Sequence, residues 1–328
     1  MHNRGGGGLG ATVSPQELGG LGASSARTKA TKTEAAFEEL RELRARYPEL
    51  IAARAAERSR RPLLGADGRL MIVAADHPAR GSLGVRGVAN AMADRYDLLR
   101  RLLVALGRPG VDGLLATADI VEDLLLLGAL EDKIVIGSMN RGGLQGASFE
   151  LDDRFTAYDA STIAAMGLDG GKMLTRIDPG DPGTVATLEA AGRAVTELGS
   201  RGLMAMLEPF MCHRADGRVV NDLSAPAVVR SVAIVSGLGA TSSYSWLKLP
   251  VIDGMEEVMA ATTLPTLLLG GDPVGPPEET YARWAAALAL PGVRGFVIGR
   301  TLLYPQDGDV AAAVDAACAL VHDVAVSP

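Results

Sequence analysis

The feature that most constrains the fold of this chain is a series of eight short apolar runs separated by stretches with helical spacing. The runs occupy residues 70–76, 113–119, 133–139, 170–177, 202–209, 243–251, 265–271 and 294–299. Near-continuous apolar strands that alternate with helices are typical of a parallel sheet covered on its outer face, and eight such units favour a closed (β/α)8 TIM barrel. The alternative is a doubly wound open sheet, but no GxGxxG motif follows a first strand.

The remaining stretches define the domain organisation. Residues 1–32 are rich in Gly, Ala, Ser and Thr without an apolar pattern, so we expect a flexible Gly-rich tail. Residues 33–64 are rich in Glu, Arg, Ala and Leu, which predicts an N-terminal helical extension interrupted near Pro48. The barrel domain is expected to occupy residues 65–328. Its helices are expected at 91–106, 156–166, 184–199, 225–236, 255–261 and 278–289.

The composition argues against several classes of partner. A formal net charge of -7 gives no broad basic surface, so neither nucleic acid nor a membrane is an expected partner. No apolar stretch approaches the roughly 18 residues that a membrane helix needs, and the N-terminal residues contain no signal-peptide core. The two cysteines, Cys212 and Cys318, cannot build a disulfide framework, which favours a cytoplasmic location.

Ionisable residues fall near the ends of four predicted strands, where the active sites of barrel enzymes lie. They are Asp76 in the first strand, Lys172 in the fourth, Glu208 in the fifth and Lys248 in the sixth. These four are the predicted catalytic residues. An interior ion-pair network that only fills the barrel is the alternative, but burying four charges costs several kcal/mol per ion before pairing.

Lys248 is the residue on which the chemical argument rests. Side chains alternate along a strand, so Tyr244, Trp246 and Lys248 share one face, and Leu247 and Leu249 lie on the other. If the leucines face the helices, Lys248 points into the barrel.

A lysine inside a barrel can act as a nucleophile. Burial disfavours the charged form of an amine, and a second cation nearby, here Lys172, disfavours it further. A neutral amine attacks a ketone or aldehyde to form an imine, and the protonated imine withdraws electrons from an adjacent carbon–carbon bond. Carboxylates can carry the accompanying proton transfers. We assign Glu208 to proton transfer, and Asp76 to orienting the substrate hydroxyls or sharing that role.

The ends of the last two predicted strands are suited to bind an anion. They contain Gly270, Gly271 and Asp272 in one case, and Gly299 and Arg300 in the other. Glycines let backbone amides approach a phosphate, and the arginine adds a charged hydrogen bond. The alternative is that the paired glycines only form a tight turn.

His77 and Arg176 complete the predicted substrate-binding set. Their alternative interpretations are a loop hydrogen-bonding residue for His77, which precedes a proline, and a surface residue for Arg176. The chain has four histidines, of which one lies in the tail and one in the last helix, so a histidine-rich zinc site is not expected. Carboxylate-held magnesium stays open, although no spacing demands it. We predict neither a metal nor a cofactor.

Four motifs in their order resemble those of the class I (Schiff-base) aldolase superfamily of fructose-bisphosphate, tagatose-bisphosphate and deoxyribose-phosphate aldolases. AADHP at 74–78 is similar to the strand-one Asp-His motif of that family, and WLKLPV at 246–251 to its Schiff-base motif. LLLGGD at 267–272 and VIGRTLL at 297–303 are similar to its two phosphate-loop motifs. The resemblance covers roughly residues 68–305. It implies a sugar phosphate as the small-molecule substrate and, by analogy, a homo-oligomer.

The pattern is closest to the tagatose-bisphosphate aldolase branch. In that branch the acid–base group falls on Glu208 and the nucleophile on Lys248, whereas the archaeal fructose-bisphosphate branch uses a tyrosine from strand five. Residues 139–143, Met-Asn-Arg-Gly-Gly, match no pattern of the family. The substrate therefore stays open among ketose phosphates and deoxy-keto-sugar acid phosphates such as those of inositol breakdown.

Two other functions are compatible with the same pocket. A phosphosugar isomerase or decarboxylase on this barrel uses metal or acid–base chemistry without an imine. A non-catalytic sugar-phosphate sensor keeps the pocket and regulates a partner, and the long N-terminal tail is its only support in the sequence. Reductive trapping of a lysine adduct distinguishes the aldolase from both.

Overall fold

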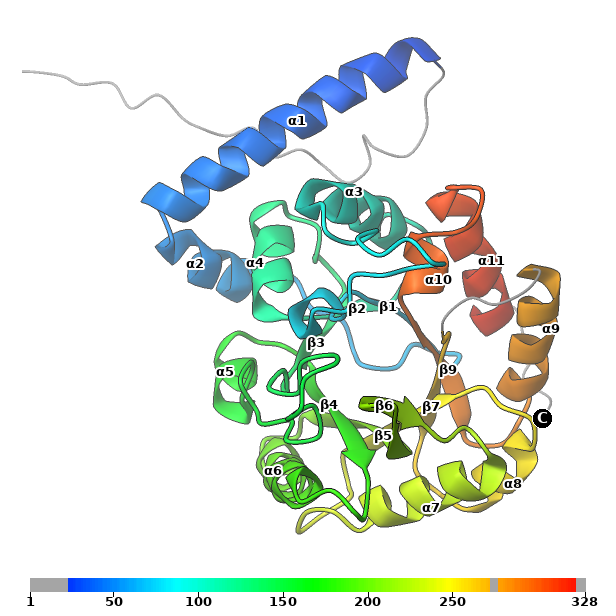
Figure 1. Cartoon of the computed structure of the whole chain (residues 1–328). Coiled ribbons are helices and arrows are strands. Elements are labelled where there is room, and N and C mark those ends of the chain that lie inside the picture. The colour runs from blue at the N-terminus through cyan, green and yellow to red at the C-terminus, as the bar shows by residue number, and fades with distance from the viewer. Residues whose placement is uncertain (1–22, 272–276, 323–328) are drawn as a thin grey trace, which may run out of the picture.

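The computed structural model describes residues 23–271 and 277–322, and at its centre is a barrel of eight parallel strands (Figure 1). In chain order they are β1 (Leu70–Ala74), β2 (Gly113–Ala116), β3 (Ile134–Ser138), β4 (Gly170–Ile177), β5 (Met204–Ala215), β7 (Ser245–Pro250), β8 (Thr266–Leu269) and β9 (Val293–Ile298). Neighbours pair in the order β4-β3-β2-β1-β9-β8-β7-β5, and β4 also pairs with β5, which closes the barrel. The predicted (β/α)8 fold is confirmed, and each apolar run overlaps one strand.

Helices surround the barrel (Figure 1). They are α1 (Ala23–Arg46), α2 (Glu49–Glu57), α3 (Arg95–Leu106), α4 (Ala118–Leu126), α5 (Ala160–Ala165), α6 (Gly183–Gly199), α7 (Ala225–Ser236), α8 (Met255–Ala260), α9 (Pro277–Leu288), α10 (Arg300–Leu303) and α11 (Val310–His322), with a 3-10 helix η2 (Pro78–Arg80). None of the described helices is both long and apolar enough to cross a membrane.

Two predicted helices are shorter in the structure because aspartates cap them. Asp94 accepts hydrogen bonds from the backbone N–H groups of Tyr96 and Asp97 at 2.9 and 3.0 Å, so α3 begins at Arg95 and not at residue 91. Asp159 caps α5 in the same way, which leaves that helix with six residues. Helix α4 was not predicted, because its first residues, Ala118 and Asp119, were assigned to the apolar run of β2.

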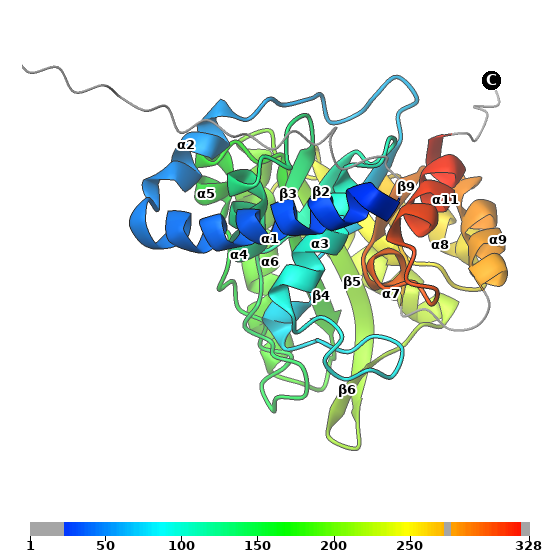
Figure 2. The ribbon, with the colours of Figure 1, turned by 90° about the horizontal axis from the view of Figure 1, so that it is seen from above.

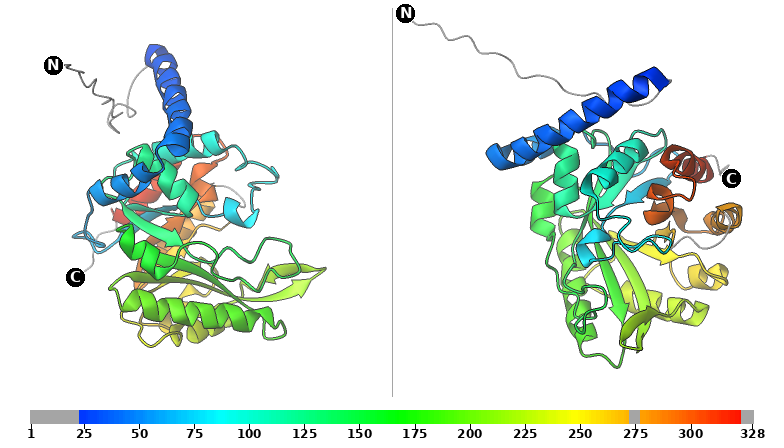
Figure 3. Two further views of the ribbon diagram at one scale, coloured as in Figure 1. Left: turned by 90° about the vertical axis from the view of Figure 1, so that its left-hand side faces the viewer. Right: turned by 45° about the horizontal axis from the view of Figure 1, so that its top comes forward.

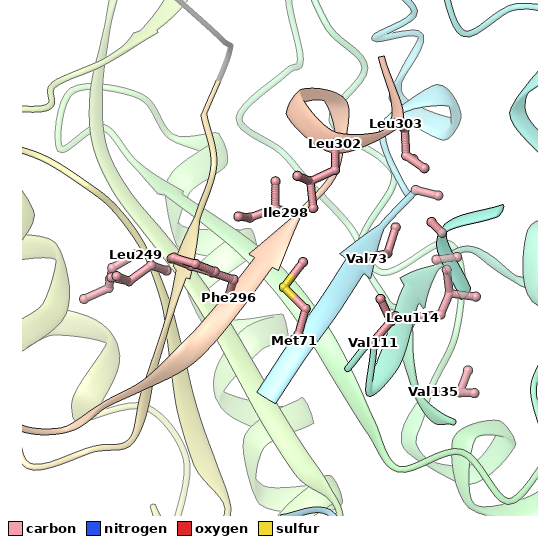
Figure 4. Close-up of a cluster of buried hydrophobic side chains, with 14 of the residues drawn as sticks. Met71, Val73, Val111, Leu114, Val135, Leu249, Phe296, Ile298, Leu302 and Leu303 are labelled. Carbon is pink, nitrogen blue, oxygen red and sulfur yellow. The ribbon is translucent and has the colours of Figure 1, made fainter. Parts of the chain in front are cut away.

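Alternation along the strands separates two layers of the core. On β1, Leu70 and Ile72 belong to the cluster inside the barrel, whereas Met71 and Val73 belong to the larger cluster between strands and helices. Figure 4 shows part of this outer cluster, including Met71, Val73 and Phe296. The barrel interior is therefore apolar beneath its carboxyl end.

The prediction for the strand that carries Lys248 is correct in all but one residue. Trp246 belongs to the inner cluster, and Leu247 and Leu249 belong to the outer one. Strand β7 begins at Ser245, so Tyr244 lies before the strand and is 44% exposed. The expectation that Tyr244 shares the inward face is therefore wrong.

Strand β5 is longer than predicted and forms a hairpin. It continues through Pro209 to Ala215 and pairs antiparallel with β6 (Arg218–Asn221). The turn contains Asp216 and Gly217, both with positive φ, at 50° and 75°. Figure 2 shows the hairpin projecting from the barrel.

The N-terminal extension packs on the outside of the barrel (Figure 3). Helices α1 and α2 are separated at Pro48, as predicted, and Phe37 of α1 stacks on Tyr96 of α3 with ring centroids 5.0 Å apart. Helix α1 begins at Ala23, so residues 23–32 are helical and not part of a flexible tail as expected. Residues 1–22 lie outside the described part of the chain, and the domain boundaries stay a prediction.

Candidate active site

Four charged residues from four strands meet at the carboxyl end of the barrel. Lys172 Nζ lies 3.3 Å from Asp76 Oδ2 and also contacts Glu208 Oε2. The other oxygen, Glu208 Oε1, lies 2.9 Å from Lys248 Nζ. Each of the four residues is at most 8% exposed. Glu208 therefore bridges two buried amines, one at each carboxylate oxygen.

Strand register explains why these residues meet. Residue 208 pairs with residue 174, two positions after Lys172 on the same face of β4. Glu208 and Lys248 each lie two residues beyond an inward apolar side chain, Met206 and Trp246 respectively. Asp76, Lys172, Glu208 and Lys248 form a charged layer, which lies directly above the apolar interior of the barrel.

The pKa values of this layer reflect burial and mutual charge. Burial alone raises the pKa of the Glu208 carboxyl, but Lys172 and Lys248 outweigh it through charge and hydrogen bonds, so the pKa lies below its ordinary value. Burial lowers the pKa of Lys172 well below its ordinary value; Glu208 opposes this, and the positive charges of Lys248, Arg141 and Arg80 reinforce it. The site thus favours an ionised Glu208 and disfavours the charged form of Lys172.

Arg141 belongs to the site and was not predicted. It follows β3, is 7% exposed, and forms an ion pair with Asp76 and a hydrogen bond to Ser138 Oγ. Ser138 in turn donates to Asp76 Oδ2 at 3.0 Å. The sequence did contain a signal for this residue. Arg141 lies just beyond an apolar run and precedes Gly142, and Arg300 likewise lies just beyond an apolar run.

The loop of residues 139–159 forms one wall of the site through two ion pairs. Arg80 pairs with Asp153, and Arg176 pairs with Glu150 and also donates to its carbonyl oxygen at 3.0 Å. Arg176 is only 8% exposed, so its alternative interpretation as a surface residue is wrong. Its predicted substrate contact stays a prediction.

A cavity of about 970 Å³ opens above the charged layer. Its lining includes Asp76, Lys172, Glu208 and Lys248 together with His77, Arg176, Gly270, Gly271, Gly299 and Arg300. Asp272, which was also predicted to bind the substrate, lies outside the described residues. The structure therefore places every other predicted site residue around one cavity.

The glycines at this cavity are required by close backbone and side-chain packing. A Cβ at residue 270 would lie 2.7 Å from Ile298 Cγ2, and one at residue 299 would lie 2.5 Å from the carbonyl oxygen of Ala74. Gly271 has a φ of 67°, which favours glycine. The glycines bring two backbone segments against the cavity.

His77 faces the cavity as a neutral imidazole. Burial, followed by the charges of Arg300, Lys248 and Lys172, lowers the pKa of His77 well below its ordinary value. Its Nδ1 lies 3.8 Å from Asp76 Oδ1, beyond hydrogen-bond distance. His77 can therefore donate or accept one hydrogen bond to a substrate without adding charge.

Within residues 23–271 and 277–322, no group of three or more His, Cys, Asp or Glu side chains is arranged to hold a metal ion. The expectation that the protein uses neither metal nor cofactor stays a prediction.

A family model described as Cgl0159-like matches residues 68–318 of this chain. The chain belongs to the Cgl0159-like family. The crystal structure of Cgl0159 from Corynebacterium glutamicum is 59% identical, with 88% of this chain and 97% of that chain covered and a TM-score of 0.86. A comparison with curated proteins gives no match.

Solved aldolases share the fold of this Cgl0159-like protein at low identity. A Schiff-base-forming fructose-1,6-bisphosphate aldolase is 20% identical, with 83% of this chain and 100% of that chain covered and a TM-score of 0.58. An archaeal fructose-1,6-bisphosphate aldolase, whose catalytic Lys is covalently bound to a carbinolamine intermediate, is 18% identical, covers 83% and 99%, and has the same TM-score. These likenesses show a common (β/α)8 barrel fold.

Proposed function

We propose that this protein is a class I aldolase, which cleaves or forms a carbon–carbon bond through a Schiff base on Lys248. The observation that carries the proposal is the position of Glu208 between the amines of Lys172 and Lys248 at the floor of the cavity. A buried amine beside a carboxylate and a second amine is suited to imine chemistry, because protons can move without bulk water.

The residues support each step of cleavage. Glu208 first takes a proton from the Lys248 ammonium, and the neutral amine attacks the substrate carbonyl and passes one of its protons to the new alkoxide. Glu208 then returns its proton to the carbinolamine hydroxyl, which leaves as water. The protonated imine then accepts the electron pair of the breaking carbon–carbon bond. Glu208, again ionised, removes the proton from the hydroxyl on the departing carbon, and an aldehyde is released. Asp76, held by Lys172 and Ser138, orients the substrate hydroxyls.

The charges around the cavity support an anionic substrate. Among the described residues, seven Lys and Arg side chains line the cavity against four Asp and Glu side chains. The cations are Arg80, Arg141, Lys172, Arg176, Lys248, Arg283 and Arg300, and the anions are Asp76, Glu150, Glu208 and Asp253. We infer that a phosphate binds to the backbone at residues 270–271 and 299 and to Arg300.

The substrate class follows from the same features. A glutamate on the fifth barrel strand supports the tagatose-bisphosphate type of acid–base group, and the cationic cavity accepts a phosphorylated ketose or keto-sugar acid.

Both cysteines are free and buried, which fits a reducing cytoplasm.

Reductive trapping tests the proposal. The protein is incubated with fructose 1,6-bisphosphate, tagatose 1,6-bisphosphate or dihydroxyacetone phosphate and borohydride, and its intact mass is measured. We expect a single adduct, and the trapped protein should lose turnover. The control variant Lys133→Met, which removes a lysine at the opposite end of the barrel, should form the same adduct and lose turnover in the same way. Turnover without an adduct contradicts the imine mechanism.

The same preparation addresses the two other functions. EDTA-sensitive turnover that survives Lys248→Met indicates a metal- or acid–base-dependent isomerase or decarboxylase. Ligand-dependent binding of a partner without any turnover indicates a sensor.

A further inference from the structure

The charges buried at the floor of the cavity are unequal in number. Two carboxylates, Asp76 and Glu208, are in direct contact with three cationic side chains, Arg141, Lys172 and Lys248. All five residues are at most 8% exposed. An uncompensated charge in such surroundings is costly, so one of the three cations is expected to give up its proton.

Arg141 cannot be the group that gives up its proton. Burial lowers the pKa of Arg141 to about 10, but the guanidinium stays protonated at neutral pH. The deprotonated group must therefore be one of the two lysines. Lys172 lies between the other two cations, because it shares Asp76 Oδ2 with Arg141 and Glu208 with Lys248, and burial together with these charges lowers its pKa.

Charged and titratable groups face Lys172 from five sides of the barrel. They are Asp76 and His77 after β1, Arg80 in η2, Arg141 after β3, Glu208 on β5 and Lys248 on β7. Arg80 is neutralised by Asp153, and His77 is uncharged. Arg141 is thus the permanent cation that makes the number of positive charges exceed the number of carboxylates.

On the basis of the aldolase function proposed above, we propose that Arg141 is a positioning residue that sets the proton count of the site. The permanent positive charge of Arg141 neutralises the Asp76 carboxylate, so that Lys172 stays a neutral amine. Lys172 then accepts, through Glu208, the proton that Lys248 must lose before it attacks the substrate.

The proton transfer is balanced within three residues. The Lys248 ammonium gives a proton to Glu208 Oε1, 2.9 Å away, and rotation of the neutral carboxyl group then brings this proton to the neutral Lys172 amine, which is in contact with Glu208 Oε2. Lys248 becomes the neutral nucleophile, Lys172 becomes an ammonium, and Glu208 is again a carboxylate. After the attack, the same path runs in reverse and delivers the proton to the departing carbinolamine hydroxyl.

The test is the pH dependence of imine formation in Arg141 variants. Dihydroxyacetone phosphate is the probe, cyanoborohydride traps the imine, and the initial rate of adduct formation is read by intact mass from about pH 5.5 to about pH 9.5. In Arg141→Met both lysines can stay charged against two carboxylates. We expect the acid limb of the rate profile to move upwards by about one pH unit or more, which lowers the rate near pH 7 about tenfold.

Two further variants distinguish charge from packing. Arg141→Lys keeps the cation, so its acid limb stays at the position of the unchanged protein. Asp76→Asn removes one carboxylate and moves the limb in the opposite direction, to lower pH, and this variant still tests the proposal if the Arg141 variants do not fold. Arg58→Met, which removes a buried arginine at the other end of the barrel, lowers stability without moving the limb.

The outcomes separate the two proposals. An adduct whose acid limb is the same in Arg141→Met, Asp76→Asn and the unchanged protein overturns the role of Arg141 and leaves the aldolase function standing. Equal losses at every pH in Arg141→Met and Arg141→Lys show a purely structural role and also overturn it. Absence of any adduct in the unchanged protein overturns the proposed function and this inference with it.

Discussion

Charged side chains are buried at both ends of the barrel, and the two ends satisfy them in different ways. At the amino end, Arg58 donates to the carbonyl oxygens of Lys133 and Gly167 at 2.6 and 2.8 Å, and Asp112 accepts from the backbone N–H of Met71 at 2.7 Å. At the carboxyl end, the two site lysines contact carboxylates and line a cavity.

The difference shows how a buried charge that stabilises the fold can be distinguished from a buried charge that takes part in chemistry. A charge bonded to several backbone atoms fixes the loops that carry those atoms, and its removal leaves polar backbone groups unpaired. A charge bonded to other side chains at a cavity can exchange protons and partners. Variants at the two ends should therefore lose different properties.

The largest effect is expected for Lys248→Met. Loss of the nucleophile should lower turnover by about 10⁴-fold or more. The fold should keep its stability, because Lys172 can take up a proton once Lys248 is absent, so that Arg141 and Lys172 balance the two carboxylates. Steady-state kinetics and a thermal melt measure both properties. A variant that unfolds while retaining turnover per folded molecule would place Lys248 with the structural charges.

Glu208→Gln should have the next largest effect and should sharpen the contrast further. The amide keeps an oxygen for hydrogen bonding but cannot carry a proton between the two amines, so we expect turnover to fall by about 10²- to 10³-fold. Glu208→Asp, which keeps the charge, should recover part of the rate. A loss of less than about tenfold in single-turnover cleavage would remove Glu208 from the proton path.

Arg58→Met should show the opposite profile at the amino end. The side chain of Arg58 is 1% exposed, and its loss leaves buried carbonyl groups unpaired. We expect the free energy of unfolding to fall by about 3 kcal/mol, as denaturant titration can measure. Adduct formation per folded molecule should be unchanged, and an equal loss of adduct would show that the two ends are coupled.

A smaller, pH-dependent effect is expected at His322, also at the amino end. The hydrogen bond to Asp112, followed by the one to Asp67, raises the pKa of His322 to about 9, although burial opposes the shift. The stabilisation is therefore present in full below pH 6.5 and is lost as the pH rises through about 9. It should amount to on the order of 2 kcal/mol, since the side chain is 24% exposed.

His322→Gln is the matched variant for this effect. The difference in unfolding free energy between the unchanged protein and His322→Gln should be large near pH 6 and should shrink by pH 9.5 or so. A difference that grows with pH would contradict the assignment.

The sequence predicts the barrel well because each strand is buried on both faces, and burial leaves a continuous apolar run. It also predicts which charged residues share the site, since the carboxyl ends of parallel strands lie on one side. Lys172, Glu208 and Lys248 were found in this way. Such inference needs only alternation along a strand and the rule for barrel sites.

What the sequence does not predict depends on contacts between distant residues. The wall of residues 139–159 is held by Arg80 with Asp153 and by Arg176 with Glu150, and neither pair has a periodic signal. Arg141 was missed because it lies in the loop after β3, and its partner Asp76 lies in the loop after β1. The β5–β6 hairpin was missed because the predicted strand ended at residue 209, whereas β5 continues through Pro209 to Ala215.

The measurement that most directly tests the central claim is the position of the trapped adduct. The chain has only five lysines, at positions 29, 32, 133, 172 and 248, so peptide mapping after reduction with dihydroxyacetone phosphate assigns the modified residue without ambiguity. We expect the adduct on Lys248 and an unmodified Lys172. An adduct on Lys172, with Lys248 unmodified, would contradict this expectation.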